Sequence, residues 1–189
     1  TSGSVDAFVA KMNEKAAALG CTNTHFTNPH GLHDSGHYSC ARDLYLMIRE
    51  AMKYPVFNEI VNSTRYTIPA TNKHDARTVV TTNMMLSYNL GAGLYYEPIR
   101  GIKTGFTTPA GPCLASLAEK NGQRYIIVLL KSTLLSSDGA VDRNGAFKTT
   151  KALYEWLFST YALQTLLTRT TVVKSIPVNY GDGVDEVGI

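Results

Sequence analysis

The sequence has no long apolar run and no block of like charge. It contains no stretch of 18 consecutive apolar residues, about the length that a membrane-spanning helix needs. Its formal net charge is only +3, and Lys and Arg form no run, which argues against the basic stripe typical of nucleic-acid binding. Such a charge suits at most an anionic small substrate or surface. With 44% hydrophobic and 17% charged residues, the chain is expected to be globular, as one domain or one domain plus a small appendage.

Cysteine is scarce, and several nucleotide and nucleophile motifs are missing. Cys21, Cys40 and Cys113 are an odd number without Cys-x-x-Cys spacing, and we interpret them as buried hydrophobes or idle thiols. A disulfide between Cys21 and Cys40 is an alternative that the sequence does not decide. The chain has no Gly-x-Ser-x-Gly, no Walker loop and no Gly-x-Gly-x-x-Gly. It also lacks an initiator Met and a signal segment, so we expect it to begin partway through a gene product.

Hydrophobic periodicity and capping residues predict helices segregated from a sheet. Ser4 is expected to cap a helix that ends at Gly20, and Ser39 one that runs to about Tyr54. A third helix is expected from Asp138 to about Tyr161. The residues that we expect this helix to turn toward the sheet are Val141, Phe147, Ala152, Leu153, Trp156 and Leu157.

Alternation and turn residues predict the strands. We expect extended segments at 65–69, 78–82, 101–107, 114–119, 124–131 and 171–178, with turns at 89–93, 109–112 and 181–183. Asn121-Gly122 predicts a type I′ hairpin turn, and the apolar run that follows predicts a strand buried on both faces. This order of elements predicts an α+β architecture.

Four histidines crowd the loop between the first two helices, namely His25, His30, His33 and His37. They could indicate a metal protein, but no zinc-ligand spacing is present. We interpret Asn28-Pro29-His30-Gly31 as a rigid turn whose side chains hold backbone groups. No metal and no cofactor are therefore expected.

The triplet Lys103-Thr104-Gly105 lies on a predicted strand. Because side chains alternate between the faces of a strand, Lys103 and Gly105 should share one face while Thr104 takes the other. Gly105, without a side chain, would let a ligand lie close against the backbone. The triplet alone is a weak signal and gains weight only from its context.

That context resembles a known family. The strings Thr27-Asn28-Pro29-His30-Gly31-Leu32 and Gly36-His37-Tyr38-Ser39-Cys40-Ala41-Arg42-Asp43-Leu44, then Thr82-Asn83, Gly101-Ile102-Lys103-Thr104-Gly105-Phe106-Thr107 and Ala110-Gly111, occur in the order typical of the serine D-Ala-D-Ala carboxypeptidases. These are low-molecular-mass penicillin-binding proteins that trim peptidoglycan stem peptides. The resemblance covers about Val5 to Val178. It implies a β-lactamase/transpeptidase-like fold, with 1–169 the later part of the catalytic domain and 170–189 the start of a small C-terminal β domain.

The family builds its site from Ser-x-x-Lys, Ser-x-Asn and Lys-Thr-Gly motifs. This sequence contains no Ser-x-x-Lys, and its single Ser-x-Asn, Ser87-Tyr88-Asn89, is interpreted as chance because the family's motif precedes the first helix found here. The nucleophile is therefore expected upstream of Thr1 or on a separate chain, and a missing segment or a second copy should cover an exposed sheet edge and core face. The alternative is a catalytically inactive relative that binds or scaffolds the cell wall.

The resemblance also implies roles for the triplet and its neighbour. Lys103 would supply positive potential, Thr104 would receive the substrate's terminal carboxylate, Gly105 would leave room for the peptide, and the Phe106 backbone N–H would serve the oxyanion hole. Met84 stands where members often carry a basic residue, and the segment from Tyr88 to Pro98 is longer than usual. The implied partners are the pentapeptide stem and β-lactams, not nucleic acid, and the implied location is outside the bacterial cytoplasmic membrane.

Overall fold

The computed structural model describes residues 2–133, 135–164, 166, 171–172, 174–177 and 186–188. Its elements in chain order are α1 (Val5–Ala18), α2 (Ala41–Ala51), α3 (Pro55–Asn62), β1 (Arg65–Ile68), β2 (Arg77–Val80), the 3-10 helix η1 (Met84–Leu86), β3 (Ile99–Thr107), β4 (Gly111–Lys120), β5 (Gln123–Leu129), α4 (Gly145–Thr160), β6 (Ser175–Pro177) and β7 (Glu186–Gly188). All paired strands are antiparallel, in the sheets β1-β2, β3-β4-β5 and β6-β7. The α+β prediction is confirmed.

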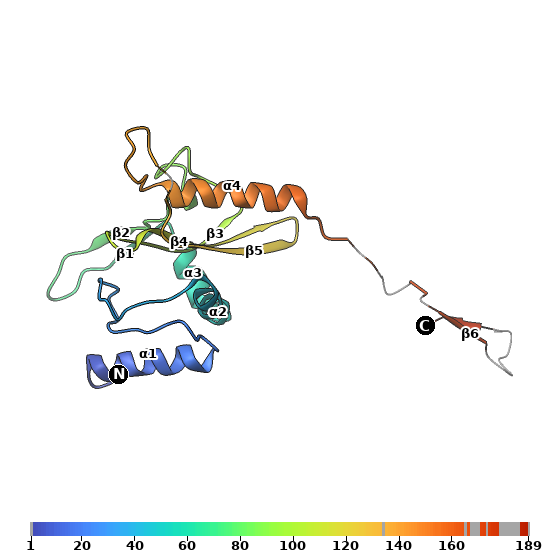
Figure 1. The fold of residues 1–189 in the computed structure, drawn as a ribbon, viewed down its shortest axis with the longest axis horizontal. Coiled ribbons are helices and arrows are strands. Elements are labelled where there is room, and N and C mark those ends of the chain that lie inside the picture. The colour runs from blue at the N-terminus through green and yellow to red at the C-terminus, as the bar shows by residue number, and fades with distance from the viewer. Residues whose placement is uncertain are drawn as a thin grey trace.

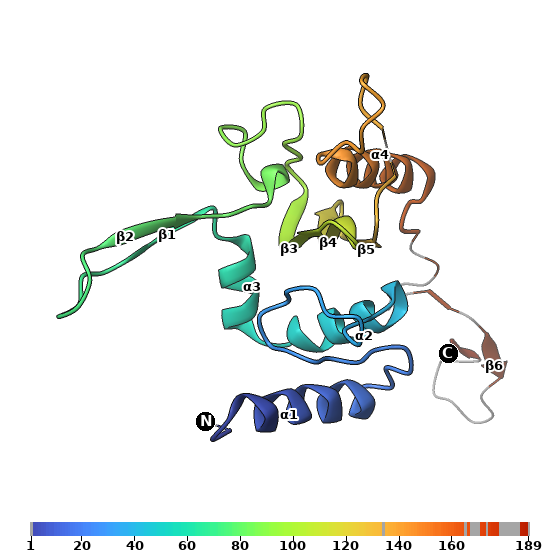
Figure 2. The same ribbon diagram turned by 60° about the vertical axis from the view of Figure 1, so that its left-hand side comes forward.

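The three-stranded sheet lies between two layers of helices. α4 covers one face, while α2 and α3 lie against the other and α1 lies beyond α2 (Figure 1 and Figure 2). The core under α4 contains Met85, Ile99, Leu114, Ala118, Ala146, Phe147 and Tyr154. The core on the α2–α3 side contains Ile48, Ile102 and Leu117. Both faces of the central strands therefore bury apolar side chains, and β3 is held from both sides.

α4 begins later than expected, at Gly145 instead of Asp138. The Asp138 carboxylate accepts hydrogen bonds from Ser136 Oγ and the Ala140 N–H, so it closes a tight turn instead of capping a helix. The predicted buried face is also partly wrong, because Val141, Ala152, Leu153 and Trp156 are exposed.

Tyr154 and Thr150 occupy the buried stripe of α4 instead, next to Phe147. The Tyr154 side chain has no exposed surface, and its hydroxyl lies 2.9 Å from Ser116 Oγ and donates to the Tyr125 carbonyl at 3.2 Å. Burial raises the pKa of Tyr154 well above its usual value, so this phenol stays neutral. A buried ring with a satisfied hydroxyl is a good core residue, which an apolar pattern alone does not reveal.

The meander follows the prediction except in the burial of β5. Asn121 and Gly122 both have positive φ, 52° and 76°, as a type I′ turn requires. Residues 125–129 are half-buried, not buried on both faces. In the described part of the chain β4 is the strand that pairs with β5, and a cavity of about 500 Å³ opens beside Leu117 and Ile126 on the α2 side.

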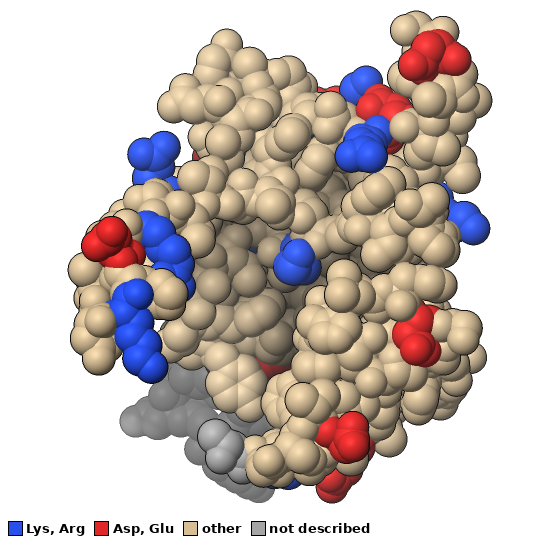
Figure 3. Space-filling model, turned by 90° about the vertical axis from the view of Figure 1, so that its left-hand side faces the viewer, with Lys and Arg blue, Asp and Glu red and all other residues tan. Residues whose placement is uncertain are grey.

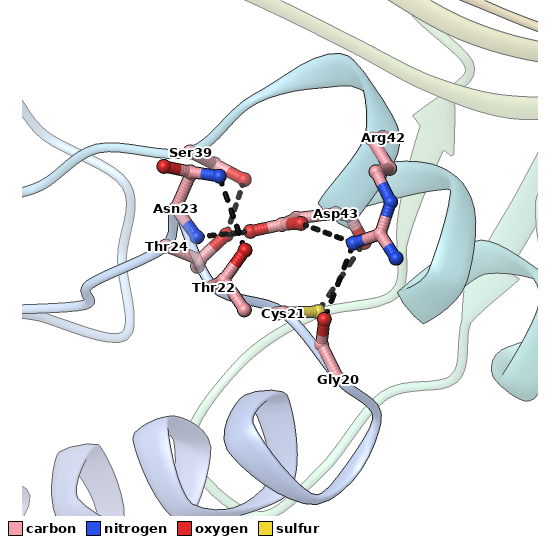
Figure 4. A network of polar contacts seen from close by, with 8 residues as sticks. All are labelled: Gly20, Cys21, Thr22, Asn23, Thr24, Ser39, Arg42 and Asp43. Carbon is pink, nitrogen blue, oxygen red and sulfur yellow. Dashed lines mark hydrogen bonds and ion pairs between the residues drawn. The ribbon is translucent and has the colours of Figure 1, made fainter.

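The loop before α2 is fixed by one buried carboxylate. Asp43 Oδ2 accepts hydrogen bonds from the Asn23 N–H at 2.7 Å and from Thr24 Oγ1 at 2.9 Å, and Arg42 lies 3.5 Å from Oδ1 (Figure 4). Burial alone would raise the pKa of Asp43, but these hydrogen bonds and the charge of Arg42 outweigh it and hold the pKa below its usual range. The carboxylate thus links Asn23 and Thr24, in the loop after α1, to the first turn of α2.

Ser39 does not cap α2, contrary to the prediction. Cys40 occupies the N-cap position without a side-chain capping bond, and Ser39 Oγ lies 2.9 Å from Thr24 Oγ1. The three thiols are free, so the Cys21–Cys40 disulfide is not formed. Cys21 is buried and donates to the Asp43 carbonyl, as expected of a buried thiol.

The histidine loop is held by its own side chains. Asn28 accepts from the Gly31 N–H at 2.8 Å and donates to the Leu32 carbonyl, while His30 Nδ1 accepts from the Leu32 N–H. The predicted rigid turn is confirmed. Within the described residues, no three His, Cys, Asp or Glu side chains are grouped as metal ligands.

The strands β6 and β7 pair with each other and lie away from the rest of the molecule (Figure 1). Residues 181–183, where a turn was expected, and Val178 lie outside the described residues. That residues 170–189 begin a small β domain stays a prediction. No helix in the described ranges is both long and apolar enough to cross a membrane.

Candidate active site

Lys103, Thr104, Gly105 and Phe106 lie consecutively on β3, at one edge of the three-stranded sheet. Ile99 anchors the start of the strand in the α4-side core, and Ile102 anchors it in the α2–α3 core. The backbone between these anchors is irregular, with a break in register between Ile99 and Ile102. The segment that follows is therefore held by packing on both faces.

The register of β3 on β4 assigns each side chain to a face. Residues directly opposite each other on antiparallel strands share a face. Lys103 is opposite Ala115, which packs on the α2–α3 core, whereas Thr104 is opposite Leu114, which lies in the α4-side core. By this register Lys103 and Gly105 lie on the α2–α3 side and Thr104 on the α4 side, as the alternation predicts, whereas Ile102, next to the break in register, departs from the alternation because it also packs on the α2–α3 core.

The backbone of β3 presents alternate groups to the open edge of the sheet. Pro112, opposite Phe106, points its carbonyl toward the Ser132 N–H, away from β3. Phe106 and Pro112 are therefore a non-hydrogen-bonded pair, and the N–H and C=O of Phe106 point outward from the sheet. The same holds for Thr104, whose carbonyl accepts from Lys103 Nζ at 2.5 Å. In the part of the chain that the structure describes, β4 is the strand that pairs with β3.

A second threonine meets Thr104 from the segment after the β1–β2 hairpin. Thr82 Oγ1 lies 2.5 Å from Thr104 Oγ1. The next residue, Asn83, is buried, and its Oδ1 caps η1 by accepting from the Met85 N–H. Met84 packs against the α4-side core and brings no charge to this place. The strings Thr82-Asn83 and Lys103-Thr104-Gly105, separate in sequence, are therefore joined by the two hydroxyls.

Arg143 is a cation beside β3 that the sequence analysis did not assign to the site. Its guanidinium lies over the Phe106 ring, 4.8 Å from the ring centre. The neighbouring acid, Asp142, is paired with Lys148 at 2.7 Å, and no carboxylate in the described ranges forms an ion pair with Arg143 or Lys103. Arg143 lies in a loop without periodicity, 37 positions from Phe106, so no local pattern could have indicated it. β3 consequently has a cation on each side of its outer edge.

An apolar cavity of about 400 Å³ opens between α2, α3 and β3, and the four consecutive residues from Ile102 to Gly105 all line it. Residues of α2 form part of its wall. A Cβ atom built on Gly105 would have only Cys113 Cβ within 4 Å, at a distance of 3.9 Å. The side chains that line this cavity from the helices are Leu44, Met47, Ile48, Ala51, Phe57 and Val61. Figure 3 shows that the end of the molecule bearing the hairpin is hollowed, with Lys or Arg side chains in and beside the hollow.

The family model for D-alanyl-D-alanine carboxypeptidases matches residues 1–133. The chain belongs to this family. It is 34% identical over 181 residues to the D-alanyl-D-alanine carboxypeptidase DacF of Bacillus subtilis, a match that covers 95% of this chain and 42% of that protein.

Solved structures of the carboxypeptidase family agree. A D-alanyl-D-alanine carboxypeptidase from Mycobacterium tuberculosis superposes with a TM-score of 0.69 at 32% identity, over 84% of this chain and 56% of that one. The Streptomyces K15 DD-transpeptidase gives a TM-score of 0.70 at 28% identity, over 82% and 55%. The penicillin-binding, transpeptidase-like fold is thereby confirmed, and the chain spans about half of the family members it matches.

The four predicted site residues lie together on β3, whereas the Ser-x-Asn string of this sequence does not belong to the candidate site. Lys103, Thr104, Gly105 and the Phe106 N–H lie at one edge, where Thr82 and Arg143 join them. Ser87-Tyr88-Asn89 instead forms the turn after η1, and the Ser87 carbonyl accepts from Leu90. The roles of the four β3 residues stay predictions.

Proposed function

We propose that these residues are part of a D-Ala-D-Ala carboxypeptidase, a serine acyl-transfer enzyme whose nucleophile lies outside residues 1–189. The observation that carries this proposal is the set of groups at the outer edge of β3. These are the Thr104 hydroxyl, the outward N–H groups of Thr104 and Phe106, the Lys103 cation, and the Arg143 cation from the loop before α4. An extended peptide can add to such an edge through main-chain hydrogen bonds. Family membership supports the choice of peptide.

The proposed roles follow from the groups that β3 presents. The Thr104 hydroxyl, held by Thr82, donates to the terminal carboxylate of the stem peptide, and the positive potential of Lys103 and Arg143 favours that carboxylate. The outward N–H of Phe106 donates to the carbonyl oxygen as it gains negative charge, a contribution of about 2.7–4 kcal/mol for one such donor. Gly105 leaves the peptide free to approach.

In the proposed reaction a serine Oγ attacks the carbonyl carbon of the penultimate D-Ala. The C–N bond to the last D-Ala breaks, the leaving amine takes a proton, and water then hydrolyses the acyl ester. β-Lactams acylate the same serine. Since this sequence has no Ser-x-x-Lys, the serine and its lysine base come from another segment or another chain.

The apolar cavity beneath Lys103 and Gly105 is the place that we propose for that segment. Its walls are almost wholly aliphatic and aromatic, and an amphipathic helix carrying the serine would bury its apolar side there against α2. A second copy of this chain is the alternative occupant.

Because the family's substrate is peptidoglycan, we place the protein outside the cytoplasmic membrane. We assign residues 1–169 to the catalytic domain and residues 170–189 to a following β domain.

Labelling by a fluorescent penicillin tests the proposal on the complete protein. Lys103→Ala and Thr104→Ala should each lower the acylation rate at least tenfold, because each removes a group that holds the anionic ligand. Thr104→Ser keeps the hydroxyl and should restore most of the rate. Lys120→Ala, an exposed lysine at the end of β4, is the matched control and should label normally.

Two outcomes contradict the proposal. Unchanged labelling of the Lys103 and Thr104 variants removes β3 from the site. A complete coding sequence without Ser-x-x-Lys, in a protein that fluorescent penicillin does not label, identifies an inactive relative instead.

A further inference from the structure

The loop between η1 and β3 is neutral and aromatic, and none of the roles proposed above uses it. From Thr78 to Tyr96 the sequence contains no charged residue, and residues 87–96 include three tyrosines, two leucines and one asparagine. This loop lies on the α4 side of the sheet, the side on which the register places Thr104 (Figure 1 and Figure 2). We call residues 87–96 the tyrosine loop.

The tyrosine loop is held in one shape by its own backbone and by its neighbours. The Gly91 carbonyl accepts hydrogen bonds from the Leu94 and Tyr95 N–H groups, both at 2.8 Å. A Cβ atom on Gly91 would come within 2.9 Å of Met84 Cβ, so the loop lies directly on η1. From α4, Lys151 Nζ donates to the Tyr95 carbonyl at 3.3 Å. Because the loop is already ordered, binding a ligand would cost it little conformational entropy.

Tyr88 projects from this ordered loop into solvent. It is 64% exposed, and Asn89 and Leu90 beside it are exposed as well. The rings of Tyr88 and Tyr95 form a T-shaped pair, with an angle of 79° between their planes and 6.3 Å between their centres. In such a pair each ring keeps at least one face free of the other. The loop therefore presents aromatic surface to solvent together with the Tyr88 hydroxyl and the Asn89 amide.

These groups complement an uncharged carbohydrate. The faces of a pyranose ring carry C–H groups that pack on an aromatic ring, and the hydroxyl and acetamido groups of a sugar form hydrogen bonds with tyrosine and asparagine side chains. The other side of the candidate site is charged, since a cavity of about 700 Å³ beside the β1–β2 hairpin is lined by Arg65 and Lys103. The tyrosine loop is thus suited to a neutral ligand and the hairpin side is not.

The tyrosine loop is close enough to the proposed active site for one substrate to reach both. Thr82, which contacts Thr104, precedes Tyr88 by six residues, and six residues of fully extended chain span about 20 Å. The separation is shorter than this, because the three residues of η1 are helical. A stem peptide of five residues extends about 17 Å as a strand. A sugar attached to its far end can therefore reach the loop.

We propose that the tyrosine loop is a carbohydrate subsite, which binds the N-acetylated hexosamine chain that carries the stem peptide by packing a sugar ring on Tyr88. This inference rests on the proposed function, because it concerns the polymer to which that substrate is attached. The loop holds the sugar and takes no part in acyl transfer. It therefore favours a peptide on a glycan chain over the same peptide free in solution.

The test compares two substrates of the complete protein: a free stem pentapeptide, and the same peptide attached to a soluble N-acetylated hexosamine oligomer. Tyr88→Ala should lower the ratio of kcat/KM for the glycan-linked peptide over that for the free peptide at least fivefold. Tyr88→Phe should keep most of the ratio, because it keeps the ring. The matched control is Tyr161→Ala, which removes a 52% exposed tyrosine in a T-shaped pair with Trp156 and should leave the ratio unchanged.

The hexosamine oligomer alone, without a peptide, is the second probe. When it is added to the complete protein, nuclear magnetic resonance should show shifts in the ring signals of Tyr88 and none in those of Tyr161. This measurement does not depend on acylation, so it separates the carbohydrate subsite from the proposed enzymatic reaction.

An unchanged ratio in Tyr88→Ala, or an equal loss of kcat/KM for both substrates, overturns the carbohydrate subsite and leaves the carboxypeptidase proposal standing. Self-association that Tyr88→Ala abolishes, without any shift caused by the oligomer, assigns this surface to a second copy of the chain and also overturns the subsite. Oligomer-induced shifts at Tyr88 in a protein that fluorescent penicillin does not label support the subsite and contradict the proposed function.

Discussion

Asp43 shows what a single buried charge does in this fold. Its side chain is fully enclosed, yet its carboxylate is paired by Asn23, Thr24 and Arg42, which join the loop after α1 to α2 (Figure 4). Removing one partner of such a group leaves buried donors unpaired, a larger loss than the net value of the hydrogen bonds. The structural role of Asp43 is therefore the position of α2, which lines the apolar cavity below Lys103.

The lowered pKa of Asp43 predicts how stability changes with pH. Because the folded pKa lies below the unfolded one, the unfolded chain binds the proton more readily, and the stabilisation is present at pH values above the unfolded pKa of about 3.9. It is lost as the pH falls through the folded pKa. Asp43→Asn should therefore lower the urea midpoint at pH 7, and the difference from the unsubstituted protein should shrink at acid pH.

Asp75→Asn, an exposed hairpin residue, is the control for this pH series and should keep the unsubstituted midpoint at every pH. A difference for Asp43→Asn that stays constant from pH 7 to acid pH would show that the effect is steric and not ionic.

At the scale of elements, the contact between α3 and β3 sets where the site lies. Gly101 has φ of +91°, and a Cβ at this position would come within 2.9 Å of the Val61 carbonyl oxygen and 3.0 Å of Val61 Cγ2. The absence of a side chain lets the last turn of α3 lie directly on the backbone of β3. Val61 also lines both cavities beside Lys103, so this contact fixes their common wall.

Gly101→Ala should destabilise the protein by about 1–3 kcal/mol, because the new methyl group overlaps Val61 and φ is positive. Chemical denaturation of the complete protein measures this change. Gly93→Ala is the control, since a methyl group there would have no neighbouring atom within 4 Å and the φ of Gly93 lies outside the left-handed region. It should change stability by less than about 0.5 kcal/mol. Equal effects of the two substitutions would contradict the close-packing argument.

Elements with a local signal were predictable from the sequence, and elements that depend on tertiary partners were not. The alternation of Lys103 and Thr104 and the Asn121-Gly122 turn are local and were predicted correctly. The start of α4 was not, because Asp138 has a competing bond to its own turn. The contact of Arg143 with Phe106 and the cavity that Arg65 and Thr104 both line arise only when distant segments meet, so the candidate site was predicted only along β3.

On the scale of the whole molecule, the domain continues beyond the family match. The match ends at residue 133, but Ala146, Phe147 and Tyr154 of α4 complete the core on one face of the sheet. Without α4, Leu114 and Ala118 would face water together with Met85 and Ile99. The helix is therefore part of the same cooperative unit as β3.

When the complete protein is truncated after residue 133, it should lose its cooperative thermal transition. When it is truncated after residue 164, it should keep the transition, because it then retains α4. Circular dichroism during heating distinguishes them. An unchanged transition in the shorter protein would show that α4 contributes nothing to the cooperative unit.

The outward orientation of Thr104 and Phe106 has a consequence for amide hydrogen exchange. In β3 the N–H groups of Gly105 and Thr107 belong to hydrogen-bonded pairs with β4, while those of Thr104 and Phe106 point to the open edge. Exchange should therefore be slow at 105 and 107 and fast at 104 and 106, in alternate residues of one rigid strand. A peptide or β-lactam bound along this edge would slow the fast pair selectively. Nuclear magnetic resonance can read this pattern, and uniform protection before ligand is added would show that the edge is already covered.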